Sequence, residues 1–235
     1  MVRSVVGDFD VPVHAFGDCA EVGEVDYVLL CVKTWQLPDA ITAIAPLVGS
    51  GTAIVTVQNG VEAPDQVAAV YGRAAVLPGA AAVIAYVDGP GIIRHLGGPG
   101  RLTFAEWDNE PTPRIDWLRT AFIDAGLDAV VAADIWAALW SKFLAIVPSG
   151  GLGTATDSPY GVLRASPGTR RLLTEATTEI RDVALALGIN LPGNIVETTL
   201  AWIDQLPADG TTSLQRDLLA RRPTNSTPGP APSYA

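Results

Sequence analysis

The stretch that decides the fold is VDYVLLCVKTWQ, residues 25–36, in which a nearly continuous apolar run over 25–32 gives way to a polar end. Such a run is typical of a strand that is buried on both faces of a parallel sheet. A second run, TAIVTV over 52–57, ends at the turn Gln58-Asn59-Gly60. Polar residues thus follow two buried strands at the sheet edge where open α/β folds bind ligands, although Asn and Gly also suit a plain tight turn.

Strands and helices alternate through the first half of the chain, which predicts an α/β layer with right-handed crossovers. Alternating apolar residues around Gly7-Asp8 indicate a β-hairpin over 2–16, and the turn Asp88-Gly89-Pro90-Gly91 separates two further extended pieces. We expect strands at 25–32, 52–57, 74–87, 91–96, 102–106 and 127–132, and helices at 37–48, at 114–125 and from the turn at 58–60 to about residue 71.

The second half of the sequence, from Asp134 onward, predicts helices only. Apolar residues repeat at helical spacing after Asp134, and a long helix begins at Ser166-Pro167 and ends at Gly188. Further helices are expected at about 193–206 and 212–221. We therefore predict an α/β part over 1–132, an all-α part over 133–222, and a disordered tail over 223–235, where PTNSTPGPAPSYA has no apolar period.

The composition excludes several classes of protein. A formal charge of −10, without a cluster of Arg and aromatic residues, argues against a nucleic-acid-binding surface. Cys19 and Cys31 have no His nearby and predict structural thiols of a reducing compartment rather than a disulfide or a metal site. Since no uninterrupted apolar run reaches membrane length and no signal peptide is visible, we expect a soluble, cytoplasmic protein.

Lysine is rare in this chain, because only Lys33 and Lys142 accompany thirteen arginines. Both lie in apolar surroundings, Lys33 at the end of VDYVLLCVK and Lys142 inside IWAALWSKFLAIV. Arg stays charged at any working pH, whereas a buried Lys can lower its pKa and donate a proton. Lys142 is therefore a candidate general acid and Lys33 a candidate phosphate or cofactor contact. The alternative is that both stems pack while their amines reach water.

Ser213 and Asp217 lie four residues apart on one face of the last predicted helix. Ser213 can bind a substrate carboxylate, and Asp217 can orient a basic partner. The spacing alone favours a plainer interpretation, in which Ser213 is the helix N-cap and a solvated Asp217 pairs with Arg221.

These segments together resemble the ketopantoate reductase family (2-dehydropantoate 2-reductases). No single segment is specific, but their order is that of the family. The resemblance implies a Rossmann-type NADPH-binding domain followed by a helical domain, with the active site in the cleft between them. The matching stretches are DYVLLCVKTWQ, TVQNGVE, GAAAVIAYVDGPG, LWSKFLAI, GGLGTAT and TTSLQRDLLARRPT.

The resemblance also implies an activity and its residues. The reaction is the reduction of a 2-keto acid to a 2-hydroxy acid, which in the type member is ketopantoate to pantoate on the route to pantothenate. By motif, Lys33, Asn59 and Ala85 lie on the cofactor side. Lys142 is the proton donor and a substrate ligand, and Ser213 contacts the substrate carboxylate. A homodimer is compatible with this assignment.

The chain departs from the family pattern at several points. It has no G-x-G-x-x-G loop (Gly151 and Gly153 come close, without a third glycine) and lacks the usual first strand. Ile146 and Gly150 stand where the best-known members have Asn, so the native substrate is expected to differ. Asn225 replaces the usual Glu, and the closing helices are missing. We therefore expect a chain cut at both ends, strand 25–32 with an unpaired edge, and weak NADPH binding.

Two other interpretations remain open from the sequence. The first is a non-catalytic remnant or binding module of the same family, which the missing phosphate loop supports. The second is a relative of similar layout, such as a 3-hydroxyacid or polyol-phosphate dehydrogenase. The pair CVKTWQ and LWSKF disfavours this second interpretation, because Lys in those two settings fits the ketopantoate group better.

Overall fold

The computed structural model describes residues 1–224, so the predicted tail over 225–235, with Asn225, lies outside the described residues. Thr224 falls inside the range expected to be disordered, yet it is buried. The chain divides into two compact units. The first contains Met1–Val32, Leu37–Gln58 and Glu62–Ile135, and the second contains Lys33–Gln36, Asn59–Val61 and the described chain from Trp136.

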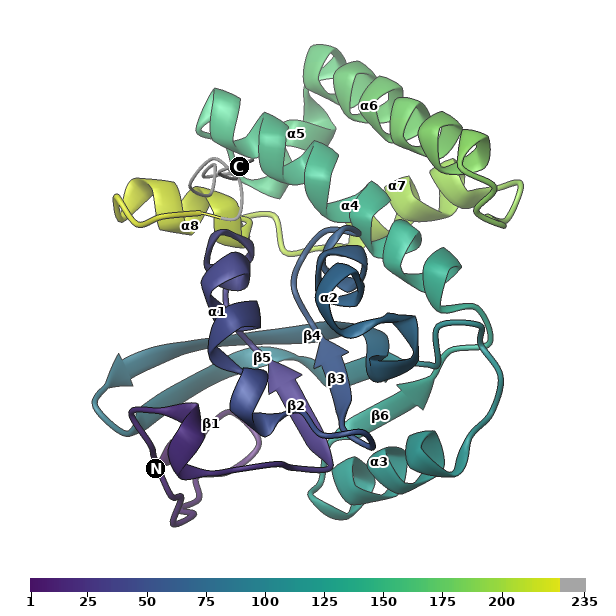
Figure 1. The fold of residues 1–235 in the computed structure, drawn as a ribbon. Coiled ribbons are helices and arrows are strands. Elements are labelled where there is room, and N and C mark those ends of the chain that lie inside the picture. Colours follow the sequence, from purple (N-terminus) through teal and green to yellow (C-terminus); the bar gives the residue numbers. More distant parts are fainter. Residues whose placement is uncertain (225–235) are drawn as a thin grey trace, which may run out of the picture. The chain divides into compact units, whose positions relative to one another are not determined.

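The first unit is built on one mixed sheet with the strand order β1-β5-β4-β3-β2, and β6 also pairs with β5 (Figure 1). Strands β2, β3 and β4 run parallel, as predicted, and β4 and β5 form an antiparallel hairpin. The predicted strands at 91–96 and 102–106 are one continuous strand. The strands are β1 (Val2–Ser4), β2 (Tyr27–Leu30), β3 (Ala53–Thr56), β4 (Val76–Gly89), β5 (Ile92–Phe104) and β6 (Asp128–Val131).

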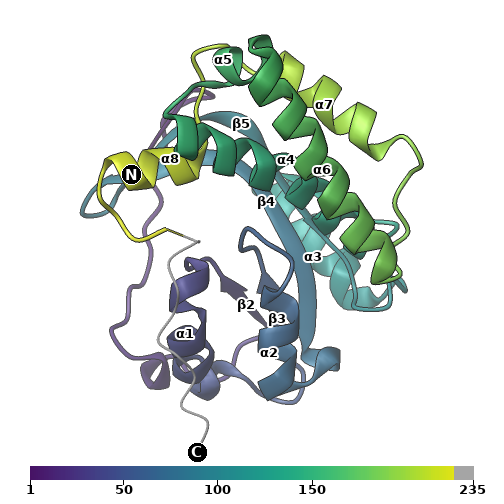
Figure 2. The same cartoon turned by 90° about the horizontal axis from the view of Figure 1, so that it is seen from above.

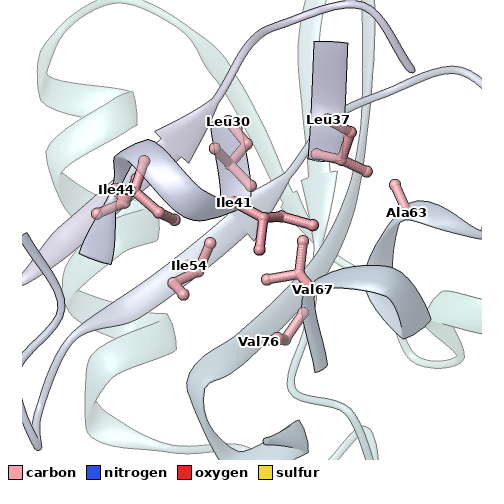
Figure 3. Close-up of a cluster of buried hydrophobic side chains, with 9 residues drawn as sticks. Leu30, Leu37, Ile41, Ile44, Ile54, Ala63, Val67 and Val76 are labelled. Atoms are coloured by element: carbon pink, nitrogen blue, oxygen red, sulfur yellow. The ribbon is translucent and has the colours of Figure 1, made fainter. Parts of the chain in front are cut away.

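Helices cover both faces of this sheet. Helices α1 (Leu37–Ala43) and α2 (Ala63–Tyr71) pack on one face, and α3 (Pro113–Asp124) packs on the other. Figure 3 shows the core beneath α1 and α2, where aliphatic side chains from the helices meet those of the strands. The buried members include Leu30, Leu37, Ile41, Ile44, Ile54, Ala63, Val67 and Val76. Burial of this kind supplies most of the stability of an α/β layer.

Strand β2 differs from the expectation that it is buried on both faces. Val28 and Leu30 are buried, but Leu29 is 41% exposed. The reason is its position, because β2 is the last strand of the sheet and no described strand pairs with its outer edge. The prediction of an unpaired edge at this strand is therefore confirmed, and the prediction of two buried faces is wrong.

The predicted hairpin over 2–16 is reduced to a single antiparallel bridge. Val2 N–H donates to the Phe9 carbonyl at 2.7 Å, and Phe9 N–H donates to the Val2 carbonyl at 3.0 Å. The main partner of β1 is instead β5, in parallel, with Val2 opposite Ile93.

The second unit contains the helices that the sequence predicted, and one more. Helices α4, α6 and α7 pack around a cluster that includes Trp140, Leu144, Ala184 and Ile195 (Figure 2). By length and composition alone α4 can cross a membrane, a test that core helices of soluble proteins also pass. The helices are α4 (Ile135–Thr156), the unpredicted α5 (Tyr160–Ala165), α6 (Pro167–Ala186), α7 (Ile195–Gln205) and α8 (Ser213–Leu219).

Candidate active site

Four of the five residues predicted from the sequence belong to the second unit. Lys33 and Asn59 lie in the short loops that follow β2 and β3, and both loops group with the helical unit. Lys142 lies on α4, and Ser213 is the first residue of α8. Ala85 belongs to the first unit.

Both the backbone and the side-chain ammonium of Lys33 form hydrogen bonds that hold it in place. Its backbone N–H donates to Gln36 Oε1 at 3.1 Å, and the Gln36 N–H donates to the Lys33 carbonyl at 2.9 Å. At the far end, the Lys33 ammonium donates to Asp217 Oδ2 at 2.7 Å. The motif CVKTWQ thus forms a compact turn that presents one cation to helix α8.

Asp217 corrects the plainer interpretation of its helix. Only 9% of the residue is exposed, and besides Lys33 its carboxylate pairs with Arg222 at 3.1 Å. The expectation of a solvated Asp217 paired with Arg221 is therefore wrong. Spacing within one helix favours Arg221, but Lys33 reaches the same carboxylate from a loop far away in the sequence, which no local pattern reveals.

Ser213 is not the N-cap of α8, contrary to the plainer interpretation. Thr212 is the cap, since its Oγ1 accepts a hydrogen bond from the Gln215 N–H at 3.2 Å. The Gln215 side chain in turn accepts from the Thr212 N–H at 3.1 Å, which completes a capping box. The Ser213 hydroxyl therefore has no part in the capping box.

Replacing Asp217 by asparagine should weaken the attachment of α8. The change removes a nearly buried carboxylate that forms ion pairs with Lys33 and Arg222. We therefore expect the free energy of unfolding to fall by about 1–3 kcal/mol. Asp204→Asn is the matched control, because Asp204 pairs with Arg170 at an exposed position. That control is expected to change stability by less than about 1 kcal/mol. Equal losses in the two variants, measured by urea unfolding, would contradict the buried role of Asp217.

Lys142 lies half-buried on α4, and burial lowers the pKa of its ammonium from 10.5 to about 8. The predicted direction of this shift is confirmed. Desolvation is its cause, because an apolar environment disfavours the charged form of an amine. The flanking Leu139 and Leu144 are buried. A Lys with this pKa is mostly protonated near neutral pH and can lose its proton without a large free-energy cost, as a general acid must.

The start of helix α8 lies against Gly150 and Gly153 of α4. Lys142, Ile146 and Gly150 succeed each other at four-residue spacing on one face of α4. A methyl group at Gly150 would lie 3.7 Å from Thr212 Oγ1, at the start of α8. One turn further, Gln215 Nε2 donates to the Gly153 carbonyl at 2.8 Å. The helix that carries Lys142 therefore also fixes the start of α8, which carries Ser213.

The turn at Gln58-Asn59-Gly60 joins the ends of two strands. Gln58 is buried, and its Nε2 donates to the Leu30 carbonyl at 2.7 Å and to the Val32 carbonyl at 3.2 Å. Gly60 has a φ of 105°, which explains the glycine. Asn59 is half-buried between them. Sequence reasoning missed the role of Gln58, although an amide directly after a buried strand was the available signal.

Ala85 belongs to the first unit, unlike the other predicted residues. It lies on β4 opposite His95, beyond the bulges that follow Ala82 and Ile84, and it is exposed. The carboxyl end of β3 pairs with a much earlier part of β4, where Thr56 is opposite Pro78. The assignment of Ala85 to a cofactor remains a prediction from the resemblance.

The starts of helices α1 and α2 do not fit the diphosphate of a dinucleotide. Such a group binds to backbone N–H groups at a glycine-rich helix start. Helix α1 has Asp39 in its first turn, and α2 has Glu62 as N-cap and Asp65 in its first turn. These carboxylates repel phosphate. Two buried polar atoms at the end of β3, Thr56 Oγ1 and Gln58 Oε1, have no hydrogen-bond partner among the described residues, but both belong to a strand end rather than a phosphate cradle.

Neither a metal site nor a surface depression among the described residues offers an alternative candidate active site. Residues 1–224 contain no group of three or more His, Cys, Asp or Glu side chains placed to hold a metal ion. A shallow depression of about 670 Å³ in the first unit is lined by Trp107, Glu106 and Arg114, among others. There the Arg73 guanidinium lies 5.0 Å from the Trp107 ring centre. None of the predicted site residues lines it.

Comparisons with known proteins agree on one family. Residues 1–109 match the family described as Ketopantoate reductase PanE/ApbA, and residues 134–227 match its C-terminal counterpart, Ketopantoate reductase PanE/ApbA C terminal. A 2-dehydropantoate 2-reductase of Mesorhizobium japonicum is 31% identical over 201 residues, which cover 77% of this chain and 61% of that protein. A 2-dehydropantoate 2-reductase of Nostoc is 26% identical over 86% of this chain and 65% of its own length.

A solved structure gives the same result for the fold. The crystal structure of 2-dehydropantoate 2-reductase from Geobacter metallireducens superposes with a TM-score of 0.87 at 29% identity, over 95% of this chain and 75% of that one. The chain spans less than two thirds of the length of the curated relatives from Mesorhizobium and Nostoc.

Proposed function

The chain belongs to the ketopantoate reductase family, and from this premise we propose that it acts in the reduction of a 2-keto acid to a 2-hydroxy acid of the 2-dehydropantoate 2-reductase type. The observation that carries the proposal is the desolvated Lys142 on α4, inside the family stretch LWSKFLAI. A place in pantothenate biosynthesis follows from the same proposal. The free thiols of Cys19 and Cys31 support a cytoplasmic setting.

The proposed role of Lys142 is to bind the ketone and protonate its oxygen. In the charged form, the ammonium polarises the carbonyl by donating a hydrogen bond to the oxygen. As negative charge develops on that oxygen, one ammonium proton transfers to it and leaves a neutral amine, which the buried setting tolerates. The proposed role of Ser213, which is exposed at the start of α8, is to donate its hydroxyl hydrogen to the substrate carboxylate.

The rate of reduction should fall at high pH. Lys142 donates only when protonated, and its pKa is about 8. We therefore expect kcat to be steady below about pH 8 and to fall about tenfold for each further pH unit. An ordinary Lys would keep its proton to above pH 10. A kcat that is constant from pH 7 to about pH 10 would contradict the proposed donor.

Substrate binding can be tested without any cofactor. Ligands that bind only the folded state raise the melting temperature, so ketopantoate at high concentration should stabilise the wild-type chain. Lys142→Ala and Ser213→Ala should each abolish that increase. Ser141→Ala is the matched control, because Ser141 neighbours Lys142 and its hydroxyl only donates to the Ala137 carbonyl at 2.7 Å. An increase that survives in Lys142→Ala, or its absence in the wild type, would count against the proposal.

The proposed cofactor is NADPH, which supplies a hydride when bound. Lys33 and Asn59 are the candidate contacts in the second unit, with Ala85 on β4. Because the described residues include no phosphate cradle, we expect the isolated chain to bind NADPH with a dissociation constant above about 100 μM. Titration of NADPH fluorescence against the purified chain measures this constant. A value of a few micromolar would show that the diphosphate has a site that the helix starts do not reveal.

The acidic starts of α1 and α2 also favour a second candidate function. A chain without a phosphate cradle can persist as a non-catalytic member that still binds 2-keto acids. Measuring the melting temperature with each ligand distinguishes the two functions, because NADPH raises it only if the NADPH site is intact. Stabilisation by the keto acid alone favours the binding module, and stabilisation by both ligands favours the reductase.

A further inference from the structure

The turn after β3 contains Asn59-Gly60, which is the single Asn-Gly pair in this sequence. In such a pair, the backbone nitrogen of the glycine can attack the side-chain amide carbon of the asparagine. Glycine favours this attack because it has no side chain to obstruct the approach and because its backbone turns freely. The attack begins deamidation, so the hydrogen bonds and the exposure of the pair decide whether the folded chain permits the reaction.

The attacking atom, the backbone nitrogen of Gly60, is available in the structure. Its N–H donates no hydrogen bond to another residue within 1–224, although most backbone N–H groups of folded proteins are paired. Gly60 is half-buried, so water and hydroxide reach the turn. A methyl group added at Gly60 would meet nothing within 4 Å, which shows that the space beside the glycine is open.

The atom that is attacked belongs to a side chain that the described residues leave unanchored. Asn59 is half-buried, and its amide forms no hydrogen bond with the described part of the chain. The preceding residue differs, because Gln58 Nε2 donates to the Leu30 and Val32 carbonyls at 2.7 and 3.2 Å. The turn is therefore fixed at Gln58, while the Asn59 amide keeps the rotational freedom that attack by Gly60 requires.

The three other asparagines of the described chain lack this arrangement. Each is followed by a residue that is not glycine and whose N–H already donates a hydrogen bond. That bond has to break before the nitrogen can attack, which raises the barrier. Asn109 is held a second time, since its Oδ1 accepts from the Ile135 N–H at 2.7 Å. The bonds that follow Asn109, Asn190 and Asn194 are Glu110 N–H to Asp108 Oδ1 at 3.1 Å, Leu191 N–H to the Ile189 carbonyl at 3.0 Å, and Ile195 N–H to the Pro192 carbonyl at 3.0 Å.

We propose that Asn59 is a site of spontaneous deamidation in the folded protein, with water as the co-reactant. The Gly60 nitrogen gives its proton to hydroxide or a buffer base and bonds to Asn59 Cγ, and the side-chain nitrogen leaves from Cγ as ammonia. Water then opens the cyclic imide at either of its two carbonyls. The product is aspartate or isoaspartate at position 59, and no atom is oxidised or reduced.

The reaction changes the charge of the turn and, in isoaspartate, its backbone. A neutral amide becomes a carboxylate, which adds one negative charge to a chain with a net charge of −10. In isoaspartate the backbone also passes through Cβ and Cγ, so the turn becomes longer. The modification itself is independent of the reductase activity. Only its consequence for the cofactor rests on the proposed function, because a carboxylate at the candidate contact Asn59 would repel the phosphates of NADPH.

Peptide mapping of the 235-residue chain tests the proposal. The protein is kept in mildly alkaline buffer well below its melting temperature, digested at acidic pH to stop the reaction, and analysed by tandem mass spectrometry. We expect the amide of Asn59 to become an acid at least about tenfold faster than those of Asn109, Asn190 and Asn194. The same incubation in urea gives the rate of each asparagine in the unfolded chain. Asn59 should keep that rate within about threefold in the native chain, because no hydrogen bond protects it.

Asn59→Gln is the matched variant, because its longer side chain has to form a larger ring and reacts far more slowly. Anion exchange of the aged wild-type chain should show a more acidic form that the variant lacks, and circular dichroism melting shows whether the variant is folded. The mapping of the wild type decides the question even if the variant does not fold. An Asn59 rate no higher than those of the other three asparagines would overturn the proposal. So would native protection of Asn59 by more than about threefold, or an equally abundant acidic form in Asn59→Gln.

Discussion

Replacing Lys142 by alanine is expected to lower the turnover of 2-keto acid reduction by about two to four orders of magnitude. The reason is that one ammonium both polarises the ketone and supplies its proton, so the variant loses both contributions at once. Since weak cofactor binding is expected, the wild type and the variant are compared by kcat/KM for the keto acid at the same NADPH concentration. Incomplete saturation with NADPH then lowers both rates alike and does not distort their ratio.

Lys142→Arg is the control that separates charge from proton donation. Arg retains the positive charge but does not release its proton at working pH. We expect Lys142→Arg to bind the keto acid measurably while remaining nearly as slow as Lys142→Ala. A loss of less than about threefold in Lys142→Ala would remove Lys142 from the chemistry. Recovery of activity in Lys142→Arg would mean that charge alone suffices.

Replacing Gly153 by alanine is expected to destabilise the protein by about 1–3 kcal/mol and to loosen α8. The added methyl group would lie 2.5 Å from Gln215 Oε1 and 2.8 Å from Gln215 Cδ, far inside contact distance. Gln215 cannot simply turn away. Its amide is held by the Gly153 and Ser158 carbonyls at 2.8 and 3.0 Å, and it also completes the cap of α8. The whole start of α8 has to move, and with it Ser213.

Gly151→Ala, two residues earlier on the same helix, provides the matched control. A methyl group there meets nothing within 4 Å, and alanine is a better helix former than glycine. We expect Gly151→Ala to leave stability unchanged or raise it by up to about 1 kcal/mol. Urea unfolding gives the stabilities, and the stabilisation by ketopantoate reports on the site. If Gly153→Ala is as stable as Gly151→Ala, the packing of α8 on α4 is looser than the contacts indicate.

Local patterns predicted most of the elements but not their partners. The buried runs at 25–32 and 52–57 became β2 and β3, and the apolar period after Asp134 became α4. Each of these signals is contained within a few residues, because side-chain alternation and helical periodicity depend on neighbours in sequence. The prediction of a hairpin over 2–16 was wrong because it too considered only neighbours in sequence. Its residues alternate correctly, but β5 competes for β1 from far along the chain.

In the candidate site, too, the sequence predicted individual residues but not their partners. The rarity of Lys in this sequence made Lys33 and Lys142 candidates, and the last predicted helix and the resemblance both pointed to Ser213. The sequence did not identify the partner of Asp217, because an ion pair with Lys33 joins two segments that only the folded chain brings within 2.7 Å. It also assigned the cap of α8 to Ser213 rather than Thr212, a difference of one residue that backbone geometry decides.

By itself, the sequence determined that this chain forms a layer of strands and helices followed by a helical part, and that its two lysines occur in apolar stretches of the sequence. Those properties follow from the order of apolar and polar residues. Only the tertiary structure decided that β2 ends the sheet and that Asp217 is buried between two cations. Each of these depends on which distant segments meet, and the free energy of such contacts is set by packing rather than by sequence spacing.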